Sequence, residues 1–143
     1  MLKVLLPVDG SESAIRATNK LVETLAWYTS RPQINLLAVQ LPVPRFANMG
    51  VVVSNEMIER YYTEECNAML EPSKKILDAA HVKYSVRTAV GPIGESIIEQ
   101  AKQSGSNMIF MGTRGMTALS NMALGSVTTK VLHLANIPVV LIH

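Results

Sequence analysis

The chain is poor in the residues that build disulfides, metal sites and aromatic clusters. Of its 143 residues, one is cysteine, one is tryptophan and two are phenylalanine. A lone cysteine, Cys66, cannot form a disulfide within the chain, so a reducing compartment is expected. Cys66 has no CxxC partner, and the three histidines (His81, His133 and His143) are not spaced as metal ligands are. A metal site built from these residues is therefore not expected.

Long apolar runs and a strong net charge are also lacking. No apolar stretch approaches the roughly 20 residues that a membrane-spanning helix needs. The apolar opening is interrupted by Pro7 and Asp9, which is not typical of a signal peptide. Thirteen Lys and Arg against 11 Asp and Glu give a formal net charge of +2, with no basic run. The sequence thus predicts a cytoplasmic protein with no membrane partner and no nucleic-acid partner.

What the chain does have is the composition of a compact domain. Hydrophobic residues make up 48% and charged residues 17%, which is ordinary for a globular protein and unlike a disordered one. A chain of this length can bury about two thirds of the surface it exposes when unfolded. We expect one domain spanning residues 1–143.

Short apolar runs alternate with segments of helical periodicity. The runs predict five strands, at residues 2–8, 34–39, 82–90, 107–111 and 137–142. Apolar residues at spacings of three and four predict helices, at residues 14–28, 55–81, 93–101 and 125–136. Pro72 should kink or interrupt the second helix near Glu71. Residues 41–54 contain two prolines and a glycine without a period, and are expected to form a long loop.

This alternation predicts an α/β fold, an open five-stranded parallel sheet with helices on both faces. Residues 82–90 alternate apolar and polar side chains, which marks an edge strand, and residues 137–142 contain Pro138, which belongs at an edge or at a strand start. The order 3-2-1-4-5 satisfies both conditions. In such a sheet a ligand crevice opens beyond the carboxyl ends of strands 1 and 4, where the winding direction reverses. Those ends carry the sequences PVDG, residues 7–10, and MGTRG, residues 111–115.

Glycines and small polar residues follow the fourth strand. Gly112 and Gly115 let the backbone approach a ligand closely, and successive bare N–H groups in such a loop bind anions. Gly125 and Ser126 then open a helix, whose unpaired N–H groups and dipole favour a phosphate, with Thr128 as an added hydroxyl donor. On physical grounds alone, the same residues could be ordinary turn and cap residues.

Several stretches of the chain resemble one family. They are the spacing Gly112-x2-Gly115-x9-Gly125-Ser126, and residues 4–17, 90–115 and 137–143. Together they resemble the universal stress protein family, and in particular its ATP-binding subgroup. The resemblance covers nearly the whole chain and implies the same five-stranded fold. It also implies a homodimer through residues 137–142, whose exposed apolar edge invites pairing with a second copy.

The resemblance implies a role for each matching residue toward ATP, with or without Mg²⁺. The adenine would lie against the first strand, including Val8, and the backbone of Val39, while Pro7 and Met111 would line the base and sugar pocket. The ribose would lie near Asp9 and Gly112. The phosphates would contact residues of the glycine loop and the last helix: Arg114, Gly115, Gly125, Ser126 and Val127. Gly94 departs from the family pattern, because a helix former is usual there.

Two of these residues have alternative readings. Asp9 could be a turn and helix-entry residue, or its carboxylate could accept hydrogen bonds from the ribose or meet the phosphates through a divalent cation. Arg114, between two glycines at a strand end, suits a phosphate but could also lie in solvent. No general base is evident for ATP hydrolysis, so turnover is expected to be slow or absent. The chain is read as a nucleotide-dependent regulatory or stress-response protein; the alternatives are a genuine ATPase and a dimeric interaction protein with a vestigial pocket.

Overall fold

A computed structural model describes residues 1–44, 53–114 and 124–143. It contains one five-stranded sheet, in which every neighbouring pair of strands is parallel and the order is β3-β2-β1-β4-β5. The α/β class and the strand order predicted from the sequence are both confirmed. The strands are β1 (Lys3–Pro7), β2 (Gln33–Gln40), β3 (Tyr84–Val90), β4 (Met108–Gly112) and β5 (Val139–Ile142).

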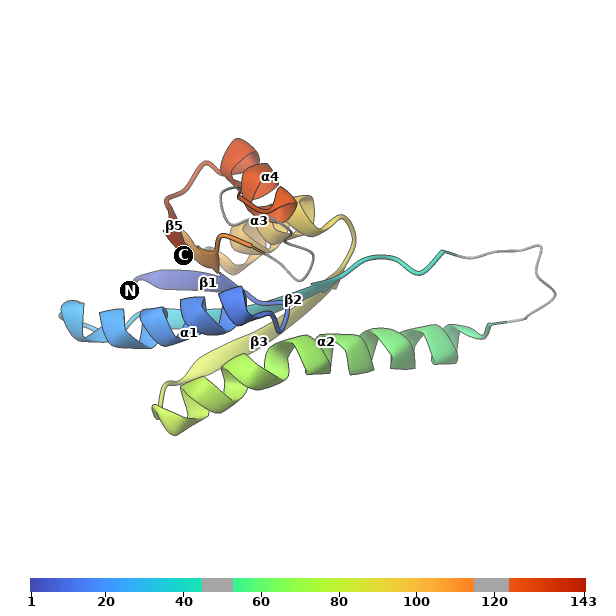
Figure 1. The fold of residues 1–143 in the computed structure, drawn as a ribbon, viewed down its shortest axis with the longest axis horizontal. Coiled ribbons are helices and arrows are strands. Elements are labelled where there is room, and N and C mark those ends of the chain that lie inside the picture. The colour runs from blue at the N-terminus through green and yellow to red at the C-terminus, as the bar shows by residue number, and fades with distance from the viewer. Residues whose placement is uncertain (45–52, 115–123) are drawn as a thin grey trace.

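Four α-helices cover the sheet within the described ranges. Helices α1 and α2 lie on one face, and α3 and α4 lie on the other (Figure 1). The helices are α1 (Glu12–Thr24), α2 (Asn55–Ala79), α3 (Ile93–Ser104) and α4 (Ser126–Leu134), and the 3-10 helix Leu25–Trp27 follows α1. None of the described helices is long and apolar enough to cross a membrane.

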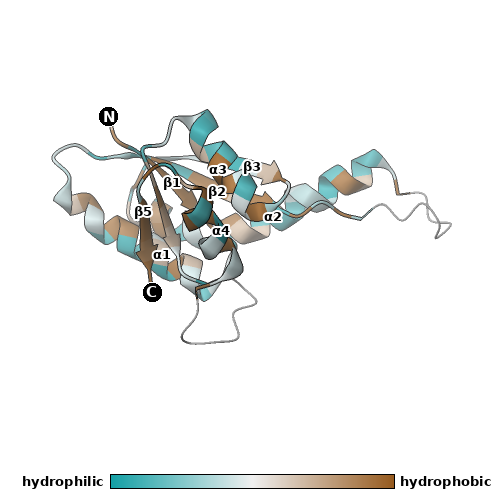
Figure 2. Cartoon of the chain, turned by 90° about the horizontal axis from the view of Figure 1, so that it is seen from above, coloured by the Kyte–Doolittle hydropathy of each residue, from teal (hydrophilic) through white to brown (hydrophobic). Residues whose placement is uncertain are grey.

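The core forms two clusters, one on each face of the sheet. Successive residues of β1 alternate between them, so that Leu5 packs with α3 and α4, whereas Leu6 packs with α1 and α2. Both leucines are completely buried. Figure 2 shows the apolar strands enclosed between helices whose outer faces are hydrophilic. Full burial of β1 and β2 explains their almost uninterrupted apolar sequences.

The two expected edge strands are at the edges of the sheet. On β3, Val86 and Val90 are each 46% exposed, and all four residues of β5 are half-buried. The opposite side of β3 faces α3, where the Arg87 Nε donates a hydrogen bond of 2.8 Å to the Gln100 Oε1. The alternation that predicted an edge therefore separates the α2 side of β3, where Val86 and Val90 are exposed, from the side tied to α3.

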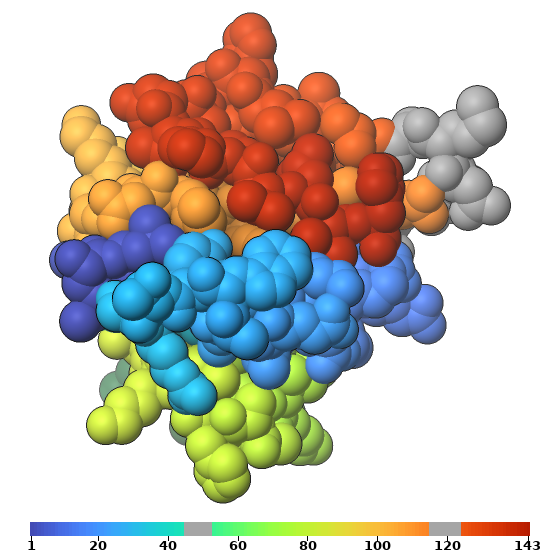
Figure 3. Space-filling model, turned by 90° about the vertical axis from the view of Figure 1, so that its left-hand side faces the viewer, coloured from blue at the N-terminus to red at the C-terminus, as the bar shows by residue number. Residues whose placement is uncertain are grey.

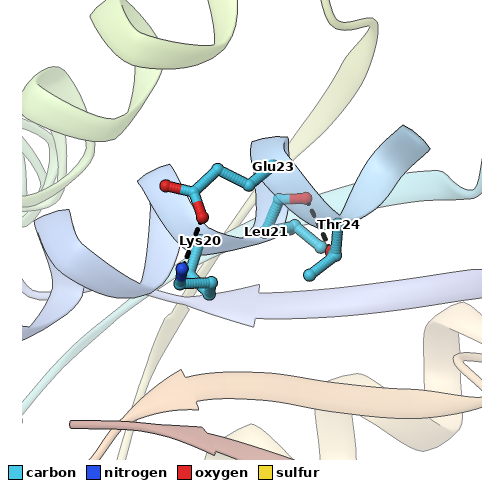
Figure 4. A network of polar contacts seen from close by, with 4 residues as sticks. All are labelled: Lys20, Leu21, Glu23 and Thr24. Carbon is cyan, nitrogen blue, oxygen red and sulfur yellow. Dashed lines mark hydrogen bonds and ion pairs between the residues drawn. The ribbon is translucent and has the colours of Figure 1, made fainter. Parts of the chain in front are cut away.

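Helix α1 ends earlier than the sequence period indicated. The periodicity continued to Tyr28, but the α-helix stops at Thr24 and tightens into the 3-10 helix. The Thr24 Oγ1 donates to the Leu21 carbonyl at 2.8 Å, beside an ion pair between Lys20 and Glu23 (Figure 4). The Leu25 N–H consequently bonds the carbonyl of Val22, three residues back. Trp27, at the end of the 3-10 helix, is 77% exposed in the chain.

Helix α2 runs through Pro72 without interruption, so of the kink or interruption predicted near Glu71, the interruption is wrong. Buried residues hold the helix against the core on both sides of the proline, Leu70 before it and Leu77 after it. The Ala68 carbonyl, which loses its helical donor at Pro72, faces Gly10, where an added β-carbon would lie 3.6 Å from that oxygen. Tertiary packing thus outweighs the local cost of the proline.

The segment predicted as a long loop, residues 41–54, is described only at its two ends. The Val43 N–H donates to the Tyr62 hydroxyl at 2.8 Å, which fixes the chain after β2 against α2. Ser54 caps α2, since its Oγ accepts from the Met57 N–H at 3.2 Å. Residues 45–52 lie outside the described residues.

Candidate functional site

The carboxyl ends of β1 and β4 lie side by side, as the predicted crevice requires. Val4 pairs with Met108 and Leu5 pairs with Ile109, so both strands reach the same edge of the sheet. The chain then turns into α1 after β1. At this junction Gly112 is in close contact with α1: a β-carbon there would lie 2.2 Å from the Ser13 Oγ and 2.8 Å from its carbonyl oxygen. Gly112 therefore allows α1 to approach the end of β4.

Ser13 joins the two chain segments at this edge and was missed by the sequence analysis. It is 3% exposed, and its Oγ accepts a hydrogen bond of 3.2 Å from the Arg114 N–H. The first turn of α1 thereby fixes where the backbone leaves β4. The one sequence signal is a small polar residue in the first turn of a helix that follows the first strand, and this is too common to single out.

Asp9 forms the turn that starts α1. Its Oδ1 accepts from the Ser11 N–H at 2.9 Å, and Ser11 in turn caps the helix by accepting from the Ala14 N–H at 3.2 Å. The prediction that Asp9 is a turn and helix-entry residue is therefore confirmed for one of its carboxylate oxygens. Its second oxygen has no hydrogen-bond partner within the described ranges, and the residue is half-buried at the crevice. Asp9 can thus hold the turn and still offer an acceptor to a ligand.

The backbone of Val39 opens toward the space beyond the end of β1. The Val8 N–H donates to the Leu37 carbonyl at 2.8 Å, whereas the Gly91 N–H donates to the Gln40 carbonyl at 2.9 Å. Because backbone groups alternate in direction along a strand, Leu37 and Val39 face β1, and Gln40 faces β3. The strand β1 ends at Pro7, opposite Leu37. The N–H and C=O of Val39 therefore point toward β1 at a position beyond the last residue of that strand, so no residue of β1 bonds them.

The start of α4 contributes backbone amides to the same edge. The Thr113 N–H donates to the Ile142 carbonyl at 3.1 Å, and the Gly125 N–H donates to the Thr113 carbonyl at 2.7 Å. The amide of Gly125 is thus already used. The following three N–H groups, of Ser126, Val127 and Thr128, belong to the first turn and have no intrahelical acceptor. They carry the positive end of the helix dipole.

Thr128 ties α4 to β4. The residue is 2% exposed, and its Oγ1 donates to the Gly112 carbonyl at 3.1 Å. This hydrogen bond occupies the hydroxyl that was expected to reach a phosphate, so any contribution of Thr128 to a ligand has to come from its backbone N–H. Ser126, by contrast, is exposed.

The side chains of the residues expected to line the base and sugar pocket are buried in the core, including that of Val39, which is 6% exposed. Pro7 is buried, Val8 is 5% exposed and Met111 is 6% exposed. Met111 packs in the same cluster as Val39, on the α3 and α4 side of the sheet. These side chains support the floor of the crevice rather than project from it. Gly115, which the glycine spacing singled out, lies outside the described residues.

A charged pair links α3 and α4 beside this edge. The Lys130 Nζ lies 3.3 Å from the Glu95 Oε1. A hydrogen bond from its own backbone N–H and, next, the hydrogen bond from Lys130 lower the pKa of the Glu95 carboxyl. Across residues 1–44, 53–114 and 124–143, no three His, Cys, Asp or Glu side chains gather as a metal site would require.

The fold defines a doubly wound α/β protein whose topological switch point lies at this edge, the place where folds of this class bind ligands. Comparison with known proteins gives a more particular answer. The chain belongs to the universal stress protein family, whose model, "Universal stress protein family", matches residues 1–143.

Relatives and solved structures are similar over nearly the whole chain. Universal stress protein MJ0531 of Methanocaldococcus jannaschii is 27% identical over 140 residues, which cover 98% of this chain and 81% of that protein. The structure of MJ0577, a universal stress protein of the same organism, has a TM-score of 0.78 at 27% identity and covers 99% of this chain and 94% of its own. The structure of the Archaeoglobus fulgidus universal stress protein in complex with dAMP has a TM-score of 0.69 at 17% identity, covering 100% and 98%.

Proposed function

We propose that this protein binds an adenine nucleotide, with ATP as the first candidate, at the carboxyl edge of β1 and β4. The observation that carries the proposal is the pair of backbone groups of Val39, which lie beyond the end of β1 beside the turn at Asp9. One donor and one acceptor on the same residue match the edge of an adenine ring. The dAMP complex of the related Archaeoglobus fulgidus protein supports this class of ligand.

In this proposal each group at the edge serves a different part of the nucleotide. Val39 binds the base, over a floor made by Pro7, Val8 and Met111. Asp9 accepts hydrogen bonds from the ribose, near Gly112. The phosphates bind the guanidinium of Arg114, the glycine loop at Gly115, and the first turn of α4, where Gly125 precedes the backbone N–H groups of Ser126, Val127 and Thr128. The positive end of the α4 dipole favours these anionic groups.

Asp9 would repel a triphosphate unless something separates the charges. A carboxylate that binds only the ribose avoids the phosphates, and a Mg²⁺ ion between them would turn the repulsion into attraction. Mg²⁺ usually uses one or two carboxylates together with phosphate oxygens, so Asp9 could suffice as its protein ligand. Titrations with and without Mg²⁺ separate the two arrangements.

The protein acts in this proposal as a nucleotide-dependent regulator rather than a fast enzyme. Rapid hydrolysis needs a positioned water and usually a general base near the terminal phosphate, and in the described part of the chain Asp9 is the one carboxylate placed at the crevice turn. Binding instead fixes the segments that leave β2 and β4, which changes the surface presented to partner proteins. We further propose a homodimer through residues 137–142, because among the described residues no strand pairs with the outer side of β5.

Isothermal titration calorimetry with ATP, ADP and cAMP tests the nucleotide site. We expect saturable binding to the wild-type protein, at least tenfold weaker binding to Asp9→Ala and to Gly115→Val, and unchanged binding to Glu23→Ala. Glu23 is an exposed residue near the end of α1 and serves as the control for a lost negative charge. Equal affinity in all four proteins would contradict the assignment of the site.

Two alternatives predict other results. A dimeric interaction protein with a vestigial pocket would give no heat with any nucleotide, and no nucleotide would be released when the purified protein is boiled. A genuine ATPase would release phosphate in many turnovers with Mg²⁺, and Asp9→Ala would abolish the release.

A further inference from the structure

A second hollow lies at the opposite, amino edge of the sheet. Its volume is about 500 Å³, which is within the range of small-molecule sites. Figure 3 looks onto this edge, where the N-terminal segment, the turn into β2 and the turn from α2 into β3 adjoin. An adjacent hollow of about 400 Å³ shares Leu25, Arg31 and Val82 with it.

The lining has an apolar floor and a cationic rim. Leu25 and Val82 are 7% and 9% exposed, and Pro32 is buried beside them. Three exposed basic residues surround this floor, from two separate turns of the chain: Arg31, His81 and Lys83. The floor can cover an apolar body while the rim binds an acidic group.

The basic side chains are not neutralised within the described part of the chain. None of the three takes part in an ion pair or a side-chain hydrogen bond there. The nearby carboxylate of Asp78 is occupied, since its Oδ1 accepts the hydroxyl of Tyr84 at 2.9 Å, and Tyr84 also lines the hollow. Asp78 keeps its negative charge, but its hydrogen bond goes to Tyr84, so the cationic groups of Arg31 and Lys83 keep their donors available to an anionic ligand.

The backbone at His81 is strained. Its φ of +53° lies in the left-handed region, and within the described ranges the other residues with positive φ are glycines. The residue follows α2, a position that glycine or asparagine normally takes. A histidine with φ in this region costs free energy that a glycine would avoid. Residues held in such conformations cluster at functional sites, and His81 lines this hollow.

We infer that this hollow binds a small organic anion, a carboxylate or phosphate ester with an apolar body, at a site separate from the nucleotide crevice. The two sites lie at opposite ends of β2, whose eight residues span roughly 25 Å. The inference does not depend on the proposed nucleotide binding. The guanidinium of Arg31 suits the planar geometry of a carboxylate or phosphate, and Lys83 adds a second positive charge.

The experiment is an NMR titration of the full ¹⁵N-labelled chain with 1-naphthyl phosphate, and with uncharged 1-naphthalenemethanol as the matched ligand. We expect saturable chemical-shift changes in residues 25–33 and 80–85 with the phosphate, and at least tenfold weaker binding of the alcohol. Arg31→Ala/Lys83→Ala should weaken the phosphate at least tenfold. Arg16→Ala/Lys102→Ala, which removes the same charge from exposed positions outside the hollow, should bind it as the wild type does.

A second variant separates binding from folding. His81→Gly relieves the left-handed backbone, so it should melt no lower than the wild type and yet bind naphthyl phosphate more weakly. Shift changes confined to Val8, Gly112 and Ser126 would place the ligand in the nucleotide crevice and overturn the inference. It would also fall if no shifts changed, if the alcohol bound equally well, or if the two double variants behaved alike.

Discussion

The Ser13 Oγ and the α-carbon of Gly112 are so close that no side chain fits between them. A β-carbon on Gly112 would lie 2.2 Å from that Oγ, 2.8 Å from the Ser13 carbonyl oxygen and 2.9 Å from its carbonyl carbon. Two of these atoms belong to the backbone of α1, and they can move only if the helix moves. The glycine that the family spacing marks for a ligand therefore also has a packing role.

This contact predicts that Gly112→Ala destabilises the protein. Overpacking a closely packed site costs about 1–3 kcal/mol, and here the helix would have to shift away from β4. The matched control is Gly94→Ala in α3, where the β-carbon would meet Lys130, at 2.6 Å from Cγ and 2.9 Å from Cβ. Rotation about χ1 can move the Lys130 Cγ but not its Cβ, so Gly94→Ala also has a packing cost, and alanine offsets part of it by about 1 kcal/mol over glycine within a helix.

Urea denaturation of both variants measures the difference. We expect the Gly112→Ala loss in the free energy of unfolding to exceed that of Gly94→Ala by at least about 1 kcal/mol. Equal losses would show that α1 adapts to the added methyl group without cost. The control also bears on the departure noted in the sequence: Gly94 stands where a helix former is usual because α4 packs closely against α3 there.

The buried hydrogen bond from Thr128 to Gly112 predicts a second stability effect. Thr128→Val keeps the shape and removes the donor, which leaves the Gly112 carbonyl without its 3.1 Å partner. An unsatisfied buried acceptor costs about 1–3 kcal/mol. In the exposed control, Thr129→Val, the lost donor served the Gly125 carbonyl, which also accepts the Thr129 N–H at 3.0 Å.

Thermal and urea unfolding should therefore rank Thr128→Val well below Thr129→Val in stability. If both variants unfolded together, the hydroxyl of Thr128 would not be needed by Gly112. Its role as an added donor to a phosphate would then become open again, and nucleotide titration of Thr128→Val would measure that role directly.

Tyr84 makes stability depend on pH in the alkaline range. Burial, then the hydrogen bond to Asp78, and then the negative charges of Asp78 and Glu71 raise the pKa of Tyr84 from 10.0 to about 12. The folded state therefore holds the phenolic proton more tightly than the unfolded state does. This contribution is fully present below pH 10 and is lost as the pH rises to about 12.

Tyr84→Phe removes that proton and supplies the comparison. The free energy of unfolding of the wild type minus that of Tyr84→Phe should be constant below pH 10 and should decrease from there to about 12. Taking the difference cancels the other groups that titrate in this range, including Cys66, whose pKa burial also raises. A difference that stayed constant through this range would mean that Tyr84 ionises alike in both states.

The sequence predicted the sheet well because burial acts on every residue of a strand. Continuous apolar runs identified the central strands, and Pro138 with the alternation around Val86 identified the edges. The end of α1 and the course of α2 were predicted less well. Single hydrogen bonds decide such points, such as that from Thr24 to Leu21, and so does packing around Pro72, and neither leaves a periodic signal.

The location of the candidate site was also predicted from the sequence, whereas the hydrogen bonds of its individual groups were not. Glycine spacing and strand order located the edge where Asp9, Gly112 and the start of α4 come together. The sequence did not show which donors of the site are already used in hydrogen bonds within the protein, because this depends on which acceptors lie nearby in space. Ser13 is separated from Arg114 by 101 residues, and no local pattern connects them. Likewise, the Gly125 N–H and the Thr128 hydroxyl, which were expected to bind a phosphate, donate instead to the carbonyls of Thr113 and Gly112.

The edge of β5 leads to a prediction about assembly. Val140 and its neighbours on β5 are half-buried, and one side of the strand has no neighbour in the sheet. An exposed apolar edge is suited to pairing with a second copy about a two-fold axis. Val140→Lys would place like charges near each other across such an interface, so it should convert the dimer into a monomer.

The opposite edge of the same sheet supplies the control. Val86 on β3 is 46% exposed, so Val86→Lys adds the same charge to an edge strand without touching β5. Light scattering after gel filtration should give a dimer mass for the wild type and Val86→Lys, and a monomer mass for Val140→Lys. Circular dichroism should show that Val140→Lys remains folded, since its side chain can reach solvent once the partner has left. A Val140→Lys protein of unchanged dimer mass would exclude β5 as the interface, and a monomeric Val86→Lys would place the interface on β3 instead.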